Sequence, residues 1–127
     1  MLIISDGFEQ ACRDCFRWIE TEHDFQFVSA KLDYDYSTVG YRNSTTIILL
    51  FLGTGSTPFL TVQSTDPKRS DEYAVDYLFE ERAPEFLPTA DDRKDPSSNG
   101  VARILLKYSS GLRSGGLDVL QGDFSIF

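Results

Sequence analysis

The run of apolar residues at positions 47–52 constrains the fold of this chain more than any other feature. These six residues follow Thr46, and the turn-forming segment 53–56 separates them from a second strand-like run at positions 59–63. Two such runs across a glycine-containing turn predict a β-hairpin. Since the first strand has no polar face, both of its faces must be covered, either by helices of the same chain or by another chain.

Helical spacing of apolar residues comes before this hairpin. Asp6 and Glu9 have the spacing of a capping box, and the apolar residues that follow predict a helix over residues 7–23. Residues 25–32 and 39–42 have the side chains of strands. One helix and two strands are therefore expected before the long hairpin.

Helical spacing returns after the hairpin. Ser70 can cap a second helix, which stops before Pro84, and a third helix is predicted over residues 101–116. Between them, residues 88–100 are dominated by turn-forming side chains and predict a mobile surface loop. The apolar tail after residue 116 is expected to dock on the core.

This order of elements indicates an α+β fold. We predict an antiparallel meander sheet of about four strands, packed with an N-terminal helix and two C-terminal helices. A chain of 127 residues fits a single domain, residues 1–127, with one continuous core. If all helices lie on one face of the sheet, the other face of the 47–52 strand needs a partner or a second copy of the chain.

The charge of the chain is strongly negative and unevenly distributed. The formal net charge is −8, and residues 1–96 hold 18 acidic and 9 basic side chains, against 2 and 3 in residues 97–127. A negative field repels nucleic acid and anionic lipid, so we expect neither a nucleic-acid nor a membrane partner and favour a basic protein. Solubility alone is the other interpretation of the same charge.

The chain is expected to be cytoplasmic. Residues 1–4 are too short and too little flanked by basic residues for a targeting segment, and the run at 47–52 is too short to span a bilayer. Two cysteines make no disulfide framework, which agrees with a reducing compartment.

Several residues could carry chemistry, and each has a simpler explanation. Cys12 and Cys15 have CxxC spacing, but both fall on the apolar stripe of the predicted helix and are interpreted as core residues. His23, the one histidine, is interpreted as a cap at the end of that helix, because no nucleophile or orienting partner lies near it in sequence. Asp33 and Asp35 lack a third metal ligand.

The glycine-rich segment 53–56 resembles a phosphate-binding loop only in composition. A phosphate loop leads into a helix, whereas Pro58 and a strand follow here, so we predict a hairpin turn. We therefore expect no metal, no cofactor and no catalytic residues.

Tyrosines interleaved with acidic residues form the best candidate for a binding site. On the second predicted helix Glu72, Asp76 and Glu80 are four residues apart and form one acidic stripe beside two tyrosines. Tyrosine offers large rigid contact area, and fixed carboxylates steer a basic partner. A solvated helix face is the alternative. The candidate partner-binding residues are Asp33, Tyr34, Asp35, Tyr36, Tyr41, Glu72, Tyr73, Asp76, Tyr77 and Glu80.

Three segments carry a resemblance to a group of bacterial proteins. They are the opening Phe-x-x-x-Cys-x-x-Cys-Phe-Arg-Trp-Ile-Glu at 8–20, the turn Val-Gly-Tyr-Arg-Asn-Ser at 39–44 before the hairpin, and Asp-Val-Leu-Gln-Gly-Asp-Phe at 118–124. In layout the chain resembles small immunity proteins of polymorphic toxin and contact-dependent inhibition systems. The resemblance implies a cytoplasmic inhibitor without enzymatic activity.

The expected function is that of a protein-binding module, an immunity protein that neutralises a basic toxin domain by occluding its active site. A nuclease is the example of such a toxin, since it must be basic to hold its substrate and an acidic protein can compete for that surface. The alternative is a homodimeric structural or adaptor protein that uses the second face of the sheet. A small carboxylate-based enzyme ranks last.

Overall fold

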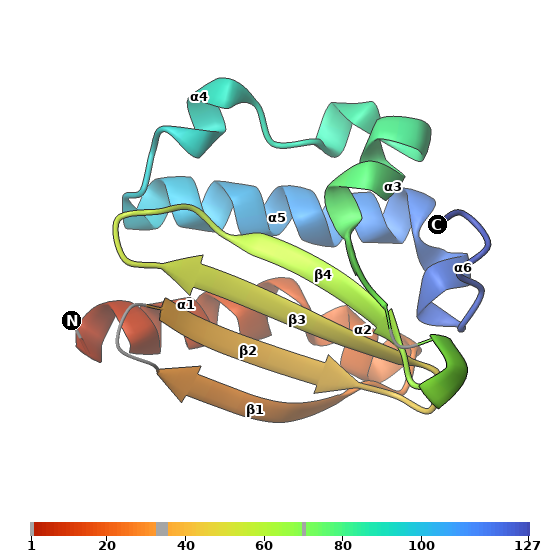
Figure 1. Cartoon of the computed structure of the whole chain (residues 1–127). Helices are drawn as coiled ribbons and strands as arrows, with labels where there is room; N and C mark the ends of the chain where they lie inside the picture. The colour runs from red at the N-terminus through yellow and green to blue at the C-terminus, as the bar shows by residue number, and fades with distance from the viewer. Residues whose placement is uncertain (1, 33–35, 70) are drawn as a thin grey trace.

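The computed structural model describes residues 2–32, 36–69 and 71–127, with side chains from residue 7 onward, Leu32 excepted. Its elements follow one another along the chain from two short helices through a sheet to a helical C-terminal third (Figure 1). They are α1 (Leu2–Cys15), α2 (Arg17–Glu22), β1 (Gln26–Leu32), β2 (Tyr36–Arg42), β3 (Thr46–Gly53), β4 (Phe59–Ser64), η1 (Pro67–Arg69), β5 (Glu72–Ala74), α3 (Val75–Arg82), η2 (Pro84–Phe86), α4 (Ala90–Arg93), α5 (Ser98–Gly115) and α6 (Leu117–Leu120).

The five strands form one antiparallel meander in the order β1-β2-β3-β4-β5. This confirms the predicted α+β class and the meander, with one strand more than expected. The hairpin predicted from the apolar run is β3 and β4, in which Leu50 pairs with Leu60. The segment between them is a turn, closed by the backbone N–H of Ser56 on the carbonyl of Gly53 and with Gly55 at a φ of 71°.

The helices α1 and α5 cover one face of this sheet, and the opposite face of β1–β3 is turned toward the viewer without a helix among the described residues (Figure 1). Burial along β3 alternates accordingly. Ile48, Leu50 and Leu52 point into the core between sheet and helices, whereas the side chains between them are only half-buried. The chain's own helices therefore cover one face of the apolar strand and leave the other.

The first predicted helix is two helices with a break at Phe16. The N–H of Phe16 still bonds to the carbonyl of Cys12, but the Phe16 backbone leaves helical geometry, with ψ at 14°. The hydroxyl of Ser109 on α5 donates to the carbonyl of Cys15 at 2.6 Å and accepts from the indole Nε1 of Trp18 at 2.8 Å. The side chain of Ser109 thus donates to a carbonyl that would accept a backbone hydrogen bond in an unbroken helix.

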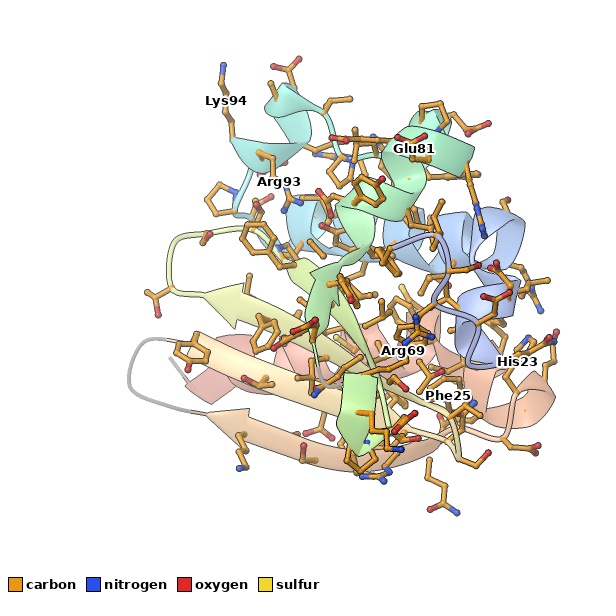
Figure 2. All side chains as sticks on the ribbon, turned by 45° about the vertical axis from the view of Figure 1, so that its right-hand side comes forward. His23, Phe25, Arg69, Glu81, Arg93 and Lys94 are labelled. Carbon is orange, nitrogen blue, oxygen red and sulfur yellow. The ribbon has the colours of Figure 1, made fainter. Side chains whose placement is uncertain are left out.

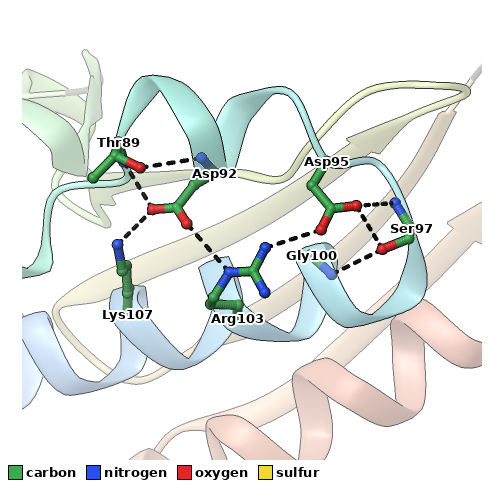
Figure 3. Close-up of polar contacts among 7 residues, drawn as sticks. All are labelled: Thr89, Asp92, Asp95, Ser97, Gly100, Arg103 and Lys107. Atoms are coloured by element: carbon green, nitrogen blue, oxygen red, sulfur yellow. Dashed lines mark hydrogen bonds and ion pairs between the residues drawn. The ribbon is translucent and has the colours of Figure 1, made fainter.

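Residues 88–100, predicted as a loop, contain the helix α4 and the first turn of α5 (Figure 3). Thr89 and Asp92 form a capping box at the start of α4. The carboxylate of Asp92 is buried and accepts hydrogen bonds from Lys107 and Arg103 of α5. Arg103 also binds Asp95 at 2.9 Å. The segment is fastened to α5 by charge pairs that its turn-forming composition does not reveal.

The tail after α5 docks on the sheet, as predicted. The hydroxyl of Thr46 donates to the carbonyl of Val119 at 2.8 Å, and the side-chain amide of Asn43 donates to the carbonyl of Leu120 at 3.1 Å. Phe124 is buried in the core. The hydrogen bonds place α6 at the start of β3, and the rings of Phe124 and Phe127 lie against Tyr73 of β5.

Among the described residues, no helix combines the length and the apolar character that crossing a membrane requires.

Candidate protein-binding surface

The helix α3 begins later than its sequence predicts, and this changes which side chains share a face. Residues 72–74 pair with β4 as the strand β5, so the helix starts at Val75 rather than at Ser70. Val75, Leu78 and Phe79 are buried. The outward positions are Tyr77, Glu80 and Glu81, which are three and four residues apart and therefore lie on one side of the helix.

The two carboxylates on this side of α3 are exposed. In the described part of the chain neither Glu80 nor Glu81 lies in an ion pair, whereas the next residue, Arg82, is tied at 2.7 Å to Asp118 of α6. That hydrogen bond lowers the pKa of Asp118 and raises that of Arg82. Figure 2 shows Glu81 on α3 above the sheet. The negative charge on the outer side of α3 is thus not compensated by an ion pair among the described residues.

Aromatic rings adjoin these carboxylates. Tyr77 is 48% exposed, and its ring centroid lies 6.0 Å from that of Phe127. Tyr73 stacks on Phe127 with 4.6 Å between centroids and 7° between planes. Packing fixes the rings before any partner arrives, which lowers the entropy cost of binding. We call Tyr73, Tyr77, Glu80, Glu81 and Phe127 the α3 surface.

The predicted acidic stripe of Glu72, Asp76 and Glu80 on one helix is wrong. Glu72 belongs to β5, where its carboxylate accepts from the hydroxyl of Thr61 at 2.6 Å. Asp76 points toward the protein interior and is half-buried, so only Glu80 keeps the predicted place. The reason is tertiary, because pairing with β4 holds residues 72–74 extended against their helical spacing.

The remaining predicted residues separate. Tyr41 is fully buried in the core and cannot contact a partner in this structure. Tyr36 is 45% exposed at the start of β2, on the uncovered side of the sheet and away from α3. Asp33, Tyr34 and Asp35 lie outside the described residues. Of the predicted residues that the structure describes, it gathers Tyr73, Tyr77 and Glu80 and places Tyr36 and Tyr41 elsewhere.

Arg93 organises a second group of polar contacts, which the sequence did not indicate. Its guanidinium donates to the carboxylate of Asp76 at 3.3 Å, to the hydroxyl of Tyr108, and to Thr57 at 3.2 Å. The same group lies 4.6 Å from the ring centre of Phe59. Arg93 thus ties α4 to α3, α5 and the start of β4. A lone arginine in a turn-rich segment gives no sequence signal for this role.

Phe59 lies on the uncovered side of the sheet, which we call the open face. It carries Ile47, Leu49 and Phe51 of β3 and the residues paired with them on the neighbouring strands. Phe59 is 51% exposed and pairs with Phe51. Ile47, Leu49 and Phe51 are half-buried by their neighbours, and an apolar area of this kind that no helix covers is typical of interaction surfaces.

The sulfur and imidazole groups have structural surroundings. Cys12 is buried, and burial raises the pKa of its thiol and, more weakly, that of Cys15. A raised pKa disfavours the thiolate that redox chemistry needs. His23 is the C-cap residue of α2, and its ring meets that of Trp18 edge-on. Among the described residues no three His, Cys, Asp or Glu side chains are placed to hold a metal ion.

Comparison of the chain with protein-family models, curated proteins and solved structures finds no match.

Proposed function

We propose that this chain is a non-enzymatic protein-binding module that binds a basic protein through the α3 surface. One observation carries the proposal. Two exposed carboxylates, Glu80 and Glu81, stand without a cation among the described residues beside aromatic rings that packing already holds in place. Tyrosine in such a setting is a frequent anchor of protein interfaces, and the carboxylates select and steer a positive partner.

We further propose that the partner is a toxin domain and that the chain is its immunity protein. The net charge of −8 and the layout resemblance to immunity proteins support this assignment. A toxin that acts on nucleic acid needs a basic substrate surface, and the α3 surface offers rings and negative charge to cover it. Both proteins would then meet in the bacterial cytoplasm, with the chain occluding the toxin's active site.

The test is capture of the partner with a tagged chain from its native cells, followed by a binding and a toxicity assay with the captured protein. We expect stoichiometric recovery of one basic protein whose toxicity on expression is suppressed by the chain. Substituting Glu80→Lys together with Glu81→Lys should weaken binding at least about tenfold, because both steering charges then repel the partner. Thermal melting should be unchanged within a few degrees, since both side chains are exposed.

A matched control keeps the same total charge. Glu9→Lys with Asp14→Lys on α1 brings the net charge from −8 to −4, as the α3 variant does. It breaks the half-exposed ion pair of Glu9 with Arg13, the exposed one of Asp14 with Arg17 and the hydrogen bond from Gln10 to Asp14. The control should bind like the native chain. Equal loss of affinity in both variants would show that binding depends on net charge and not on the α3 surface. Undiminished binding of the α3 variant would contradict the assignment of the site to α3.

A further inference from the structure

The open face has an ordered layout that follows from the sheet register. Directly paired residues of antiparallel strands point to the same side. One row across the sheet therefore reads Gln26, Arg42, Ile47, Gln63 and Glu72 on strands β1 to β5. The apolar position is central, a cation lies on the β2 side, and an anion lies at the β5 edge.

The next two rows are asymmetric in the size of their side chains. Gly40, Leu49 and Thr61 form the second row, and Thr38, Phe51 and Phe59 the third. On the β2 side the side chains are small or missing, and on the β4 side they are larger. Along β3 itself the centre of the face is apolar throughout.

We propose that the open face binds the open face of a second copy of this chain, with a two-fold axis that follows β3. Rotation about such an axis lays the β1–β2 half of one copy over the β4–β5 half of the other. Ile47, Leu49 and Phe51 then meet their own counterparts on the axis. The result is a symmetric interface in which each patch contacts the same patch, with aligned sheets in the middle and helices outside.

Size and charge both fit under this rotation. Thr38 of one copy lies over Phe59 of the other, so a small side chain receives a large one. Gly40 is buried under Val28, Ser29 and Leu49 of its own chain, and these side chains face the Thr61 row of the other copy. Arg42 lies over the β4–β5 side of the same row, within reach of Glu72 of the other copy. Within one chain these two side chains stand three strands apart, about 14 Å at ordinary strand spacing, too far for an ion pair.

The area suits a weak, reversible dimer. The strands β1 to β5 have 7, 7, 8, 6 and 3 residues, which at about 3.3 Å per residue and about 4.8 Å between strands gives a flat area of roughly 500 Å². This is less than the roughly 800 Å² per partner of a standard interface, as expected for a weak dimer. The proposal stands apart from the α3 surface, so a failure of one leaves the other.

The experiment is sedimentation equilibrium of the full chain and of two charge-reversal variants, Arg42→Glu and Glu72→Arg. The native chain should dimerise below about 1 mM. Each variant alone should have a dimer dissociation constant at least about tenfold higher than that of the native chain, because both symmetry-related contacts then join like charges. An equimolar mixture of the two variants should recover dimers, since both contacts of the mixed dimer join opposite charges.

Control variants with the same charge changes lie on the helix side of the molecule. Arg17→Glu and Asp14→Arg are exposed there and should leave dimerisation unchanged. A native chain that is monomeric at about 1 mM would overturn the proposal, and the open face would then have another occupant or none. Dimers that survive in both variants, or variants whose mixture does not recover dimers, would also overturn it.

Discussion

At the scale of single residues, two buried tyrosines differ in whether their hydroxyl has a hydrogen-bond partner. The hydroxyl of Tyr108 donates to Asp76 at 3.0 Å and accepts from Arg93. The hydroxyl of Tyr41 is buried without a hydrogen-bond partner among the described residues. Burial is the main reason that the pKa of both phenols is raised. A buried polar group that lacks a partner costs free energy, whereas a partnered one does not.

Replacement of each tyrosine by phenylalanine should separate these two cases. Tyr108→Phe should lower the free energy of unfolding by about 1–3 kcal/mol, because Asp76 and Arg93 lose a bonded neighbour in a half-buried site. Tyr41→Phe should leave it unchanged or raise it, because only an unpaired hydroxyl is removed. Urea titration of both variants measures the difference. A large loss in Tyr41→Phe would show that this hydroxyl has a partner.

Two glycines in helices provide a second comparison. A Cβ at Gly111 of α5 would lie 2.3 Å from the ring of Phe79, so the backbone there must approach the ring directly. A Cβ at Gly7 of α1 would meet none of the described side chains within 4 Å. Gly111→Ala should lower the free energy of unfolding by about 1–3 kcal/mol through overpacking. Gly7→Ala should raise it by about 0.5–1 kcal/mol through helix propensity. The same urea titration tests both, and equal effects would contradict the packing shown here.

At the scale of elements, local pattern was sufficient where a segment's neighbours in space are also its neighbours in sequence. The β3–β4 hairpin could be predicted for this reason. The apolar stripe of α5 could be predicted because helical periodicity is visible within the segment itself, although α5 packs on residues far away in sequence. Prediction failed where a distant side chain decides. The hydroxyl of Ser109 takes the carbonyl of Cys15 where α1 ends, and β4 draws residues 72–74 out of the predicted helix. The acidic stripe was lost with that helix start, while the Tyr77 and Glu80 pair survived because both lie inside α3.

The helix α4 depends on Asp92, which should give it a pH dependence. Hydrogen bonds from Lys107 and from the Thr89 backbone hold the pKa of Asp92 well below its usual range. A carboxyl whose pKa is lowered on folding stabilises the native state above its unfolded pKa, near 3.9, and loses that contribution as the pH falls further. Asp92→Asn should therefore cost about 1.5–3 kcal/mol at pH 7 and less at about pH 2, as the pH approaches the lowered pKa of the folded state. Denaturant titrations at both pH values measure this.

The neighbouring residue supplies the control for this prediction. Asp91 is exposed and lies in no ion pair within the described part of the chain. Asp91→Asn should change the free energy of unfolding by less than about 0.5 kcal/mol at either pH, as exposed substitutions usually do. If Asp92→Asn behaves in the same way, the buried cluster of Figure 3 does not stabilise α4.

At the scale of the whole molecule, the charge of −8 predicts a salt-dependent encounter with a basic partner. Association should slow markedly as salt rises from about 0.01 M to about 1 M, because the screening length falls from roughly 30 Å to 3 Å. The rate of dissociation should change much less. The Glu80→Lys and Glu81→Lys variant should show a shallower salt dependence than the α1 control of equal charge. Stopped-flow measurement of the association rate against salt concentration tests this. Identical salt dependences of the two variants would show that Glu80 and Glu81 do not steer the partner.

The sheet and the helices also differ in the sequence separation of the residues that they bring into contact. Every strand pairs with its neighbour in sequence, whereas the bond from Trp18 to Ser109 joins residues 91 positions apart. Local pairings form early and distant ones late. A ribosome therefore releases the whole sheet before it releases α5. Until then the face that holds Ile48 and Leu50 lacks α5, and the nascent chain exposes apolar strands on which chaperones act.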